Sequence, residues 1–181
     1  HARSVRQILN QGGLEKTIIF ASGNLDEYRL RELLSSAAPI DGFGIGTALD
    51  VSGDAPSLDC AYKLQEYAGK PRRKRSEGKA TWPGRKQVYR NYSADGCMAG
   101  DVVALEENDP HDGQPLLMPA MQAGRRILGD AALDQMRQRT LAGYAHLPKA
   151  ITTLEMAPPY PVAISTALQV LATELDAVHV P

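Results

Sequence analysis

Two short apolar segments near the start of the chain, Thr17–Ala21 and Ile40–Thr47, each run into a turn made of small residues. The first segment is rich in β-branched residues, which is typical of a strand buried on both faces of a sheet. A helical pattern of apolar residues precedes each segment. Helix, strand, helix, strand with short links is the order found in parallel α/β sheets and barrels. The predicted fold class is therefore α/β.

The two helical patterns have recognisable ends. Apolar residues spaced i, i+3, i+4 from Val5 predict a helix that ends at Gly12-Gly13. The same spacing over Leu30–Leu34 predicts the second helix. Asn24, with Glu27 three residues later, is typical of an N-cap with its capping-box partner. We therefore expect the second helix to begin directly after Asn24.

The pattern changes after about residue 58. We expect residues 1–58 to be the C-terminal strands and helices of a barrel, and residues 59–181 to be a smaller mixed, β-rich region with closing helices. Further strands are predicted at Cys60–Tyr67, Lys86–Tyr92, Val102–Leu105 and Leu116–Gln122. The last third is predicted to be helical, with one helix over Leu133–Tyr144 capped by Asp130, and a final helix carrying Pro161 in its first turn.

The two small-residue turns, Ser22-Gly23-Asn24 and Gly44-Ile45-Gly46-Thr47, carry the functional prediction. Successive strands of a parallel barrel deliver their C-terminal ends to one face, so the turns should lie one strand spacing apart, roughly 5 Å. Glycine lets the backbone approach a ligand closely. The first N–H groups of a following helix are unpaired and favour an anion. We therefore predict a phosphate site formed by Ser22, Gly23, Asn24, Gly44, Gly46 and Thr47.

Charge and composition argue against several other classes of protein. With 20 Lys+Arg against 21 Asp+Glu, the formal net charge is −1, which removes the electrostatic argument for a nucleic-acid or anionic-membrane binder. No apolar run approaches the roughly 20 residues of a membrane span. The basic run Lys70–Arg75 lacks interleaved aromatics, so a solvated loop, or one that faces an anionic substrate, is expected. Cys60 and Cys97 are expected to be small buried apolar residues, and the histidines have no zinc-like spacing.

An ordered set of motifs resembles the nicotinate phosphoribosyltransferase family. The matching segments are residues 19–27 (IFASGNLDE), 41–47 (DGFGIGT), 62–64 (YKL), 73–79 (RKRSEGK), 83–90 (PGRKQVYR), 115–117 (PLL), 147–148 (LP) and 160–162 (YPV), followed by Ser165. Each segment is short, but together they span essentially the whole chain in the family's order. The order and spacing make the resemblance specific.

The resemblance implies the C-terminal part of a type II phosphoribosyltransferase, with an irregular TIM-like barrel beside a smaller mixed α+β region. The family forms nicotinate mononucleotide and pyrophosphate from nicotinate and phosphoribosyl pyrophosphate, with Mg²⁺ and coupled ATP hydrolysis, in NAD biosynthesis. A cytoplasmic homodimer with small-molecule partners, and with no nucleic acid or membrane partner, is implied. The backbones of Gly23, Asn24, Gly46 and Thr47 would hold the 5′-phosphate, helped by the hydroxyls of Ser22 and Thr47.

Other parts of the family's active site are expected upstream of His1. They are the phosphorylated histidine, the pyridine-stacking aromatic, the carboxylate-binding arginine and an Asp-Ser-Gly-Asp loop. The chain opens in helical pattern without Met or a signal peptide, and it looks cut from something longer. We therefore expect no catalytic residue and no metal ligand in this chain, and no turnover by the chain alone. Arg73 and Arg75 depart from the family pattern and receive no role.

Three alternatives remain open at this point. A sibling enzyme of the same architecture could use nicotinamide or quinolinate, because the base pocket is expected upstream. A non-catalytic phosphate-binding or structural module would use the same turns without a reaction. An RNA-binding domain acting through residues 70–79 would show affinity that falls steeply with salt.

Overall fold

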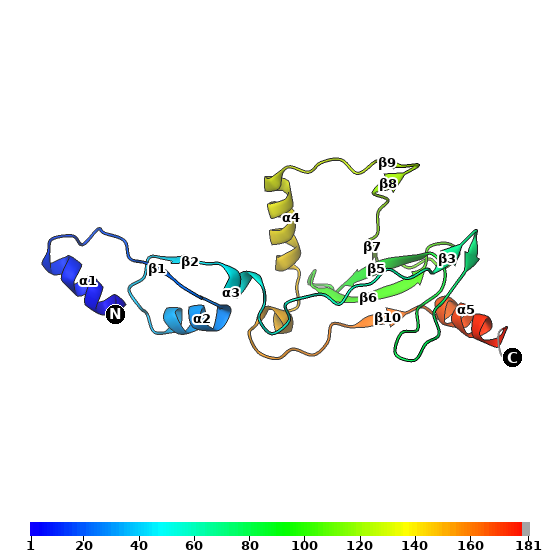
Figure 1. Cartoon of the computed structure of the whole chain (residues 1–181), viewed down its shortest axis with the longest axis horizontal. Coiled ribbons are helices and arrows are strands. Elements are labelled where there is room, and N and C mark those ends of the chain that lie inside the picture. The colour runs from blue at the N-terminus through cyan, green and yellow to red at the C-terminus, as the bar shows by residue number, and fades with distance from the viewer. Residues whose placement is uncertain (179–181) are drawn as a thin grey trace. The chain divides into compact units, whose positions relative to one another are not determined.

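The computed structural model describes residues 1–178 and divides the chain into two compact units, His1–Ala61 and Tyr62–Pro181. The first unit is coloured blue to cyan in Figure 1, and the second runs on from there to red. Both units combine helices with small sheets, so the fold is mixed α/β. Within residues 1–178 no sheet closes into a barrel. The predicted boundary after residue 58 stays a prediction.

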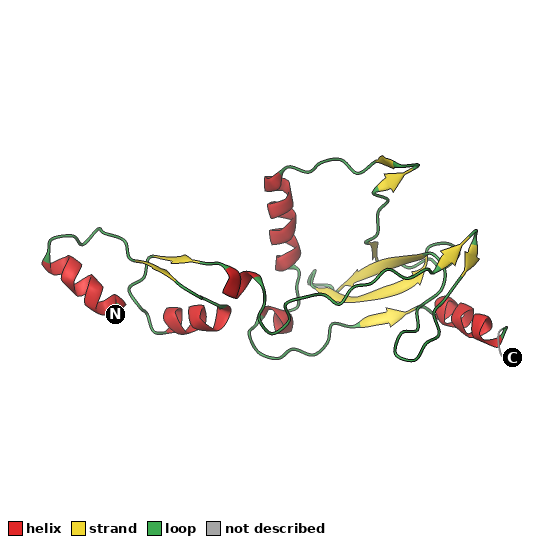
Figure 2. Cartoon of the chain, in the orientation of Figure 1, coloured by secondary structure: helices red, strands yellow, loops and turns green. Residues whose placement is uncertain are grey.

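The first unit contains a two-stranded parallel sheet and three helices (Figure 2). In chain order they are α1 (Ala2–Gln11), β1 (Phe20–Ser22), α2 (Glu27–Ser35), β2 (Gly42–Gly44) and α3 (Thr47–Asp50). The strands pair with Phe20 opposite Gly42 and Ser22 opposite Gly44. The predicted alternation of helix and strand is confirmed, and so is the end of the first helix before Gly12.

Asp41, which precedes β2, fixes the start of this strand pair. Its Oδ2 accepts a hydrogen bond from the backbone N–H of Ile19 at 2.6 Å and one from Arg6 of α1 at 3.4 Å. Arg6 also donates to the carbonyl of Thr17 at 2.6 Å. These bonds join α1 to the segments that enter both strands, so the two strands are aligned before their C-terminal ends are reached.

Two expectations for the first unit are wrong. The first strand is not buried on both faces, since Ile18 and Phe20 are 70% and 63% exposed and β1 has β2 as its strand neighbour on one side only within the described residues. The cap of α2 is Asp26 rather than Asn24, and its Oδ1 accepts the N–H of Arg29 at 2.8 Å. Asn24 has φ +48°, whereas an N-cap needs extended backbone.

The second unit is built on a four-stranded sheet with the order β10-β6-β5-β7. The strands are β5 (Lys86–Tyr92), β6 (Met98–Leu105), β7 (Gln114–Pro115) and β10 (Val162–Ile164). β5 pairs antiparallel with β6 and β7, and β10 runs parallel to β6. The predicted strand over Lys86–Tyr92 is confirmed, and the predicted Val102–Leu105 is the second half of β6.

Helix α5 (Thr166–Ala177) packs beside β6 and supplies much of the buried core of this unit. Leu168 and Ala104 are fully buried, and Ala172 is nearly so. Ser165 caps the helix, because its Oγ accepts the N–H of Leu168 at 3.2 Å. The expectation that Pro161 lies in the first turn is wrong, since the strand β10 stands between Pro161 and the helix.

Two predicted strands of the second unit are mostly irregular. Cys60–Tyr67 is reduced to β3 (Glu66–Tyr67), which pairs with β4 (Lys70–Pro71). Leu116–Gln122 is reduced to β8 (Met121–Gln122), which pairs with β9 (Arg125–Arg126). In both segments only two residues have a strand partner. A strand persists only where its ladder bonds are made.

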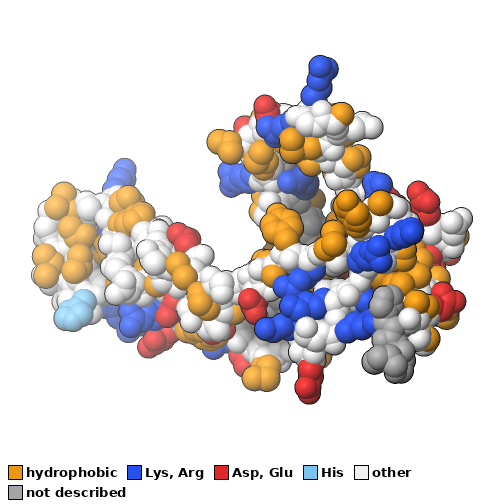
Figure 3. Space-filling view, turned by 45° about the vertical axis from the view of Figure 1, so that its right-hand side comes forward, with side chains coloured by type: hydrophobic (Ala, Val, Ile, Leu, Met, Phe, Trp, Pro, Cys, Tyr) orange, Lys and Arg blue, Asp and Glu red, His pale blue; other side chains and the backbone are white. Residues whose placement is uncertain are grey.

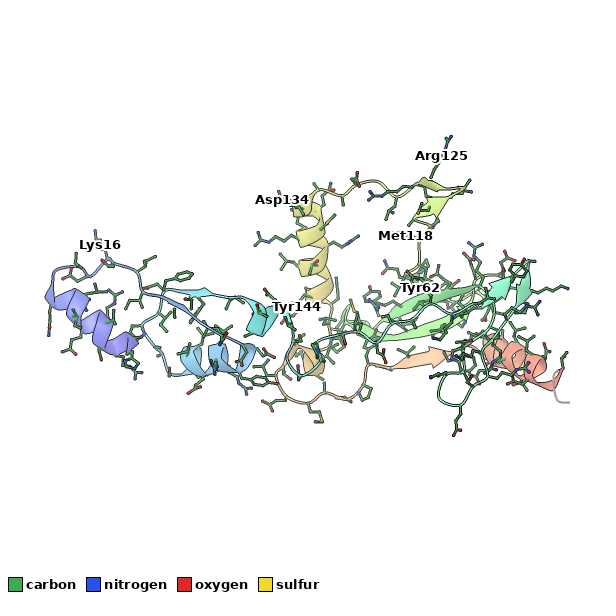
Figure 4. The ribbon with its side chains drawn as sticks, viewed as in Figure 1. Lys16, Tyr62, Met118, Arg125, Asp134 and Tyr144 are labelled. Atoms are coloured by element: carbon green, nitrogen blue, oxygen red, sulfur yellow. The ribbon has the colours of Figure 1, made fainter. Side chains whose placement is uncertain are left out.

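Residues 117–142 form an arm in which every residue is exposed. It contains the β8–β9 hairpin and most of α4 (Leu133–Ala145), and a 3₁₀ helix (Lys149–Thr152) follows. Figure 3 shows apolar side chains on the surface of this part, and Figure 4 marks Met118, Arg125 and Asp134 along it and Tyr144 near the end of α4. Asp130 was expected to cap α4, and this expectation is wrong. The cap is Ala132, and Asp130 forms an ion pair with Arg126 at 2.6 Å.

Part of the basic run, Arg73 and Arg75, binds the C-terminal end of α5. Arg73 Nη1 donates to the carbonyl of Ala172 at 3.1 Å and to Asp176 Oδ2 at 2.9 Å. Arg75 Nε lies 2.9 Å from Asp176 Oδ1, and its guanidinium also binds the carbonyl of Leu175. Cations are favoured at a helix C-terminus, where carbonyl groups are unpaired. Two residues without a predicted role therefore cap this helix.

The expectation for the cysteines is wrong for Cys60, which is exposed, and holds only partly for Cys97, which is half-buried. Cys60 lies in the segment between α3 and β3, where residues 51–64 are all exposed, so no core is available to it. No helix within residues 1–178 is both long and apolar enough to cross a membrane.

Candidate functional site

The six residues predicted to bind phosphate line a single pocket in the first unit. The pocket has a volume of about 350 Å³ and is lined by Ser22, Gly23, Asn24, Gly44, Ile45, Gly46, Thr47 and Ala48. Small-molecule sites in proteins are commonly about 300–1,000 Å³, so the pocket suits a small ligand or one group of a larger ligand. Residues from two turns that are distant in sequence are thus brought together.

The parallel pairing of β1 and β2 creates this pocket. Ser22 and Gly44 are the last residues of their strands and lie opposite each other. Both turns therefore open at the same end of the sheet. Gly42 and Gly44 permit the close pairing, because a Cβ on Gly42 would lie 2.7 Å from the Phe20 ring and one on Gly44 would lie 2.9 Å from the Ser22 Cβ. Gly44 has a packing role in addition to lining the pocket.

The first turn depends on left-handed backbone. Gly23 has φ +115° and Asn24 has φ +48°. Glycine adopts the first of these values at little cost, and asparagine tolerates the second better than most residues. Leu25, directly after them, is buried at 8% exposure and anchors the turn to the rest of the unit. The consecutive left-handed residues turn the chain from β1 toward α2.

The second turn leaves open space in front of its glycine. A Cβ on Gly46 would have no atom within 4 Å, and φ there is −154°. Gly46 is the N-cap of the short helix α3, which begins at Thr47. The protein's own packing therefore does not require glycine at position 46. A requirement for glycine there would come from a ligand that approaches the main chain.

The pocket offers main-chain donors and no titratable side chain. Within the described chain, the N–H groups of Gly23, Asn24, Gly46 and Thr47 donate to no other residue. The lining contains serine, threonine and asparagine as its polar side chains. Adjacent free N–H groups form a concave site that favours an anion. The predicted contribution from α2 is smaller than expected, because Asp26 already takes the free N–H of Arg29.

Arg29 is a residue that the sequence patterns did not single out. Its Nη1 donates to the carbonyl of Asn24 at 3.1 Å, so a cation lies beside the first turn. An arginine in the first turn of a surface helix ordinarily indicates only a solvated side chain. The contact back to residue 24 depends on the turn geometry, which periodicity does not reveal.

The residues of this pocket do not fit a magnesium ion by themselves. Mg²⁺ binds through carboxylate, water and phosphate oxygens in octahedral geometry. The lining has no carboxylate, and within residues 1–178 no three His, Cys, Asp or Glu side chains group as metal ligands. The chemistry assigned to this pocket is accordingly anion binding by backbone N–H groups.

Comparison with known proteins identifies one family repeatedly. A model of the nicotinate phosphoribosyltransferase C-terminal domain matches residues 109–172. The chain is 45% identical over 170 residues to "Nicotinate phosphoribosyltransferase pncB2" of Mycobacterium tuberculosis, which covers 91% of this chain and 35% of that protein. It is 30% identical over 207 residues to the nicotinate phosphoribosyltransferase of Mus musculus, covering 97% of this chain and 38% of the relative.

A solved structure agrees in fold. The crystal structure of human nicotinic acid phosphoribosyltransferase matches with a TM-score of 0.71 at 24% identity, over 96% of this chain and 36% of that one. The chain thus spans little more than a third of the length of the relatives it matches. The resemblance indicated by the sequence motifs is confirmed: over nearly its whole length, this chain corresponds to the C-terminal region of the nicotinate phosphoribosyltransferase family.

Proposed function

We propose that this chain supplies the 5′-phosphate-binding turns of a nicotinate phosphoribosyltransferase. The reaction joins nicotinate to phosphoribosyl pyrophosphate, forms nicotinate mononucleotide and pyrophosphate, and is coupled to ATP hydrolysis in NAD biosynthesis. The observation that carries the proposal is the pairing of Ser22 with Gly44, which places two turns with free N–H groups around one pocket. The family relationship indicates that the phosphate held in such a pocket would be the 5′-phosphate of phosphoribosyl pyrophosphate.

Holding the 5′-phosphate would help the transfer step without touching the reacting atoms. Transfer at the anomeric carbon passes through an oxocarbenium-like state, so the protein's main tasks are to position the reactants and to stabilise charge. Binding energy from a remote, non-reacting group can support that step. Gly23, Asn24, Gly46 and Thr47 would provide the donors, and the hydroxyls of Ser22 and Thr47 could assist through their oxygen-bound protons.

The proposal includes an architecture for the two parts of the chain. Residues 1–58 would be the last strands and helices of a TIM-like barrel, and residues 59–181 a smaller mixed region with closing helices. The parallel pairing of β1 and β2 supports the first assignment, since barrel strands are parallel. The enzyme would be a cytoplasmic homodimer that binds small molecules and neither nucleic acid nor membrane.

The chemical groups for base recognition and phosphoryl transfer would come from outside this chain. None of the described residues matches the family's phosphorylated histidine in context, and Mg²⁺ would be bound mainly through the substrate's phosphates. We therefore expect the 181-residue chain to bind phosphoribosyl pyrophosphate but to give no product with nicotinate, ATP and Mg²⁺. Product formation by the chain alone would contradict this part of the proposal.

Titration with phosphoribosyl pyrophosphate, followed by NMR of the backbone amides, tests the site. The amides of Gly23, Asn24, Gly46 and Thr47 should shift together as ligand is added. Gly46→Ala should keep the fold, because no atom lies within 4 Å of the new methyl, and should weaken binding at least several-fold by filling the approach to the main chain.

Gly53→Ala is the matched control for this variant. It adds the same methyl in the same unit, also with no atom within 4 Å, and outside the pocket. Its affinity should equal that of the parent chain. Equal affinity for Gly46→Ala, or amide shifts that fall elsewhere, would overturn the assignment. Binding with no activity in any polypeptide containing the chain would instead favour a non-catalytic phosphate-binding module.

A further inference from the structure

Arg29, in the first turn of α2, holds the preceding turn at two points. Its backbone N–H donates to Asp26 Oδ1 at 2.8 Å, and its side-chain Nη1 donates to the carbonyl of Asn24 at 3.1 Å. Between these two acceptors lies Leu25, which is buried at 8% exposure. The segment from Asn24 to Asp26 is thus held on the outside by one arginine and on the inside by one buried leucine.

The orientation of the Asn24 carbonyl matters for anion binding in this pocket. Asn24 is left-handed, with φ +48°, and its N–H is one of the free donors of the pocket. Carbonyl oxygens carry partial negative charge and repel a phosphate if they face it. A guanidinium bonded to this oxygen holds the peptide in one orientation and offsets its charge. Charge-assisted hydrogen bonds of this kind are stronger than neutral ones.

We propose that Arg29 is a positioning residue for the first phosphate-binding turn, and this inference rests on the proposed function. Arg29 does not line the pocket, so it acts through Asn24 and not by touching the ligand. It keeps the Asn24 carbonyl turned away from the phosphate and leaves the neighbouring N–H groups directed at it. The role requires a hydrogen-bond donor at this position more than it requires a positive charge.

Three variants separate positioning from charge. Arg29→Ala removes the donor and the charge, and it keeps a good helix former on an exposed helix surface. Arg29→Gln removes the charge but retains an N–H donor, on a side chain shorter than that of arginine. Lys16→Gln removes the same unit of charge from the exposed Lys16 in the same unit, whose side chain points away from the ribbon in Figure 4. Far-ultraviolet circular dichroism establishes that each variant is folded.

The experiment is the amide-detected titration with phosphoribosyl pyrophosphate. Arg29→Ala should weaken binding roughly tenfold, as expected for one lost hydrogen bond, and should reduce the ligand-induced shift at Asn24 more than at Thr47. Arg29→Gln and Lys16→Gln should each stay within about twofold of the parent. A change at Asn24 that Thr47 does not share is a readout that general loss of structure would not produce.

Several results would overturn the inference. Parent-like binding by Arg29→Ala would show that Arg29 is not needed. Equal loss of affinity in Arg29→Gln and Arg29→Ala would show that Arg29 acts through its charge alone. Equal loss of affinity in Lys16→Gln would show that long-range charge attraction, and not positioning, is at work. If Arg29→Ala does not fold, Arg29→Met takes its place, because methionine is a helix former of similar length without a donor or a charge. Parent-like affinity of Arg29→Met then refutes positioning, and tenfold weakening with a smaller shift at Asn24 than at Thr47 supports it. If the parent chain binds no phosphoribosyl pyrophosphate, the proposed function fails with the inference. Failure of Arg29 alone leaves the pocket assignment in place.

Discussion

Ser22, the last residue of β1, lies directly opposite Gly44, the last residue of β2, in a parallel pair. A Cβ on Gly44 would stand 2.9 Å from the Ser22 Cβ, closer than such atoms approach in proteins. The absence of a side chain at position 44 therefore lets the two strand ends meet. Their meeting is what brings the two small-residue turns into one pocket.

Gly44→Ala should destabilise the first unit by about 1–3 kcal/mol, because the added methyl forces the strands apart. Urea unfolding monitored by circular dichroism would measure the loss. Gly46→Ala is the control, since its methyl meets no atom within 4 Å, and its free energy of unfolding should change by less than about 0.5 kcal/mol. Equal stability of the two variants would show that the strand pairing is looser than described.

Affinity for a phosphate monoester should rise with pH between about 5 and 7.5. The pocket lining has no titratable side chain, so the pH dependence comes from the ligand, whose second ionisation has a pKa of about 6. Isothermal titration with ribose 5-phosphate at both pH values would measure it. Sulfate keeps its charge over this range and should bind equally well at both. Tighter monoester binding at the lower pH would contradict an amide-lined dianion site.

Asp176→Asn should weaken the attachment of the basic run to α5. Asp176 lies 2.9 Å from both Arg73 and Arg75, and its side chain is 48% exposed, so solvent screens the ion pairs. We expect a loss of about 1 kcal/mol at low salt that shrinks in high salt. Thermal unfolding at two salt concentrations measures it. Glu174→Gln, on the same helix, is the control, and a loss that does not change with salt would argue against an ion-pair origin.

Asp101→Asn should destabilise the second unit most at neutral pH. Asp101 accepts hydrogen bonds from Arg90 at 2.9 and 2.8 Å and from Tyr160 at 3.1 Å, and the bonds from Arg90 are the main reason that the pKa of Asp101 lies below 3.8. A lowered folded-state pKa stabilises the fold above the unfolded value, and this stability is lost as pH falls through the folded value.

The expected loss for Asp101→Asn is about 3 kcal/mol at pH 7, because Arg90 would be left without its carboxylate. The stability difference between the variant and the parent should narrow below about pH 4, where the Asp101 carboxyl begins to protonate in the unfolded parent chain and the parent loses stability. Urea unfolding across this range provides the measurement. Tyr160→Phe keeps the ion pair and should cost less. A stability difference for Asp101→Asn that grows toward acid pH would contradict a lowered pKa for this carboxyl.

Much of the local structure follows from the sequence alone. The repeat of apolar residues from Val5 and the spacing over Leu30–Leu34 predicted α1 and α2, and the strand predicted over Lys86–Tyr92 is β5. The glycine-containing turns after β1 and β2 were predicted by composition, and they lie together as expected from parallel strand ends. These features depend on residues close in the chain, whose steric and hydrophobic preferences act without distant partners.

Tertiary structure decided the features that depend on distant partners or on exact turn geometry. Asp26 rather than Asn24 caps α2, since only the folded turn sets which residue is left-handed. Arg73 reaches Ala172, 99 positions away, so a basic run that looks solvated becomes part of a helix end. Cys60 is exposed because the segment around it meets no core. Local patterns determine which elements form, whereas burial and hydrogen-bond partners arise only when remote segments are brought into contact.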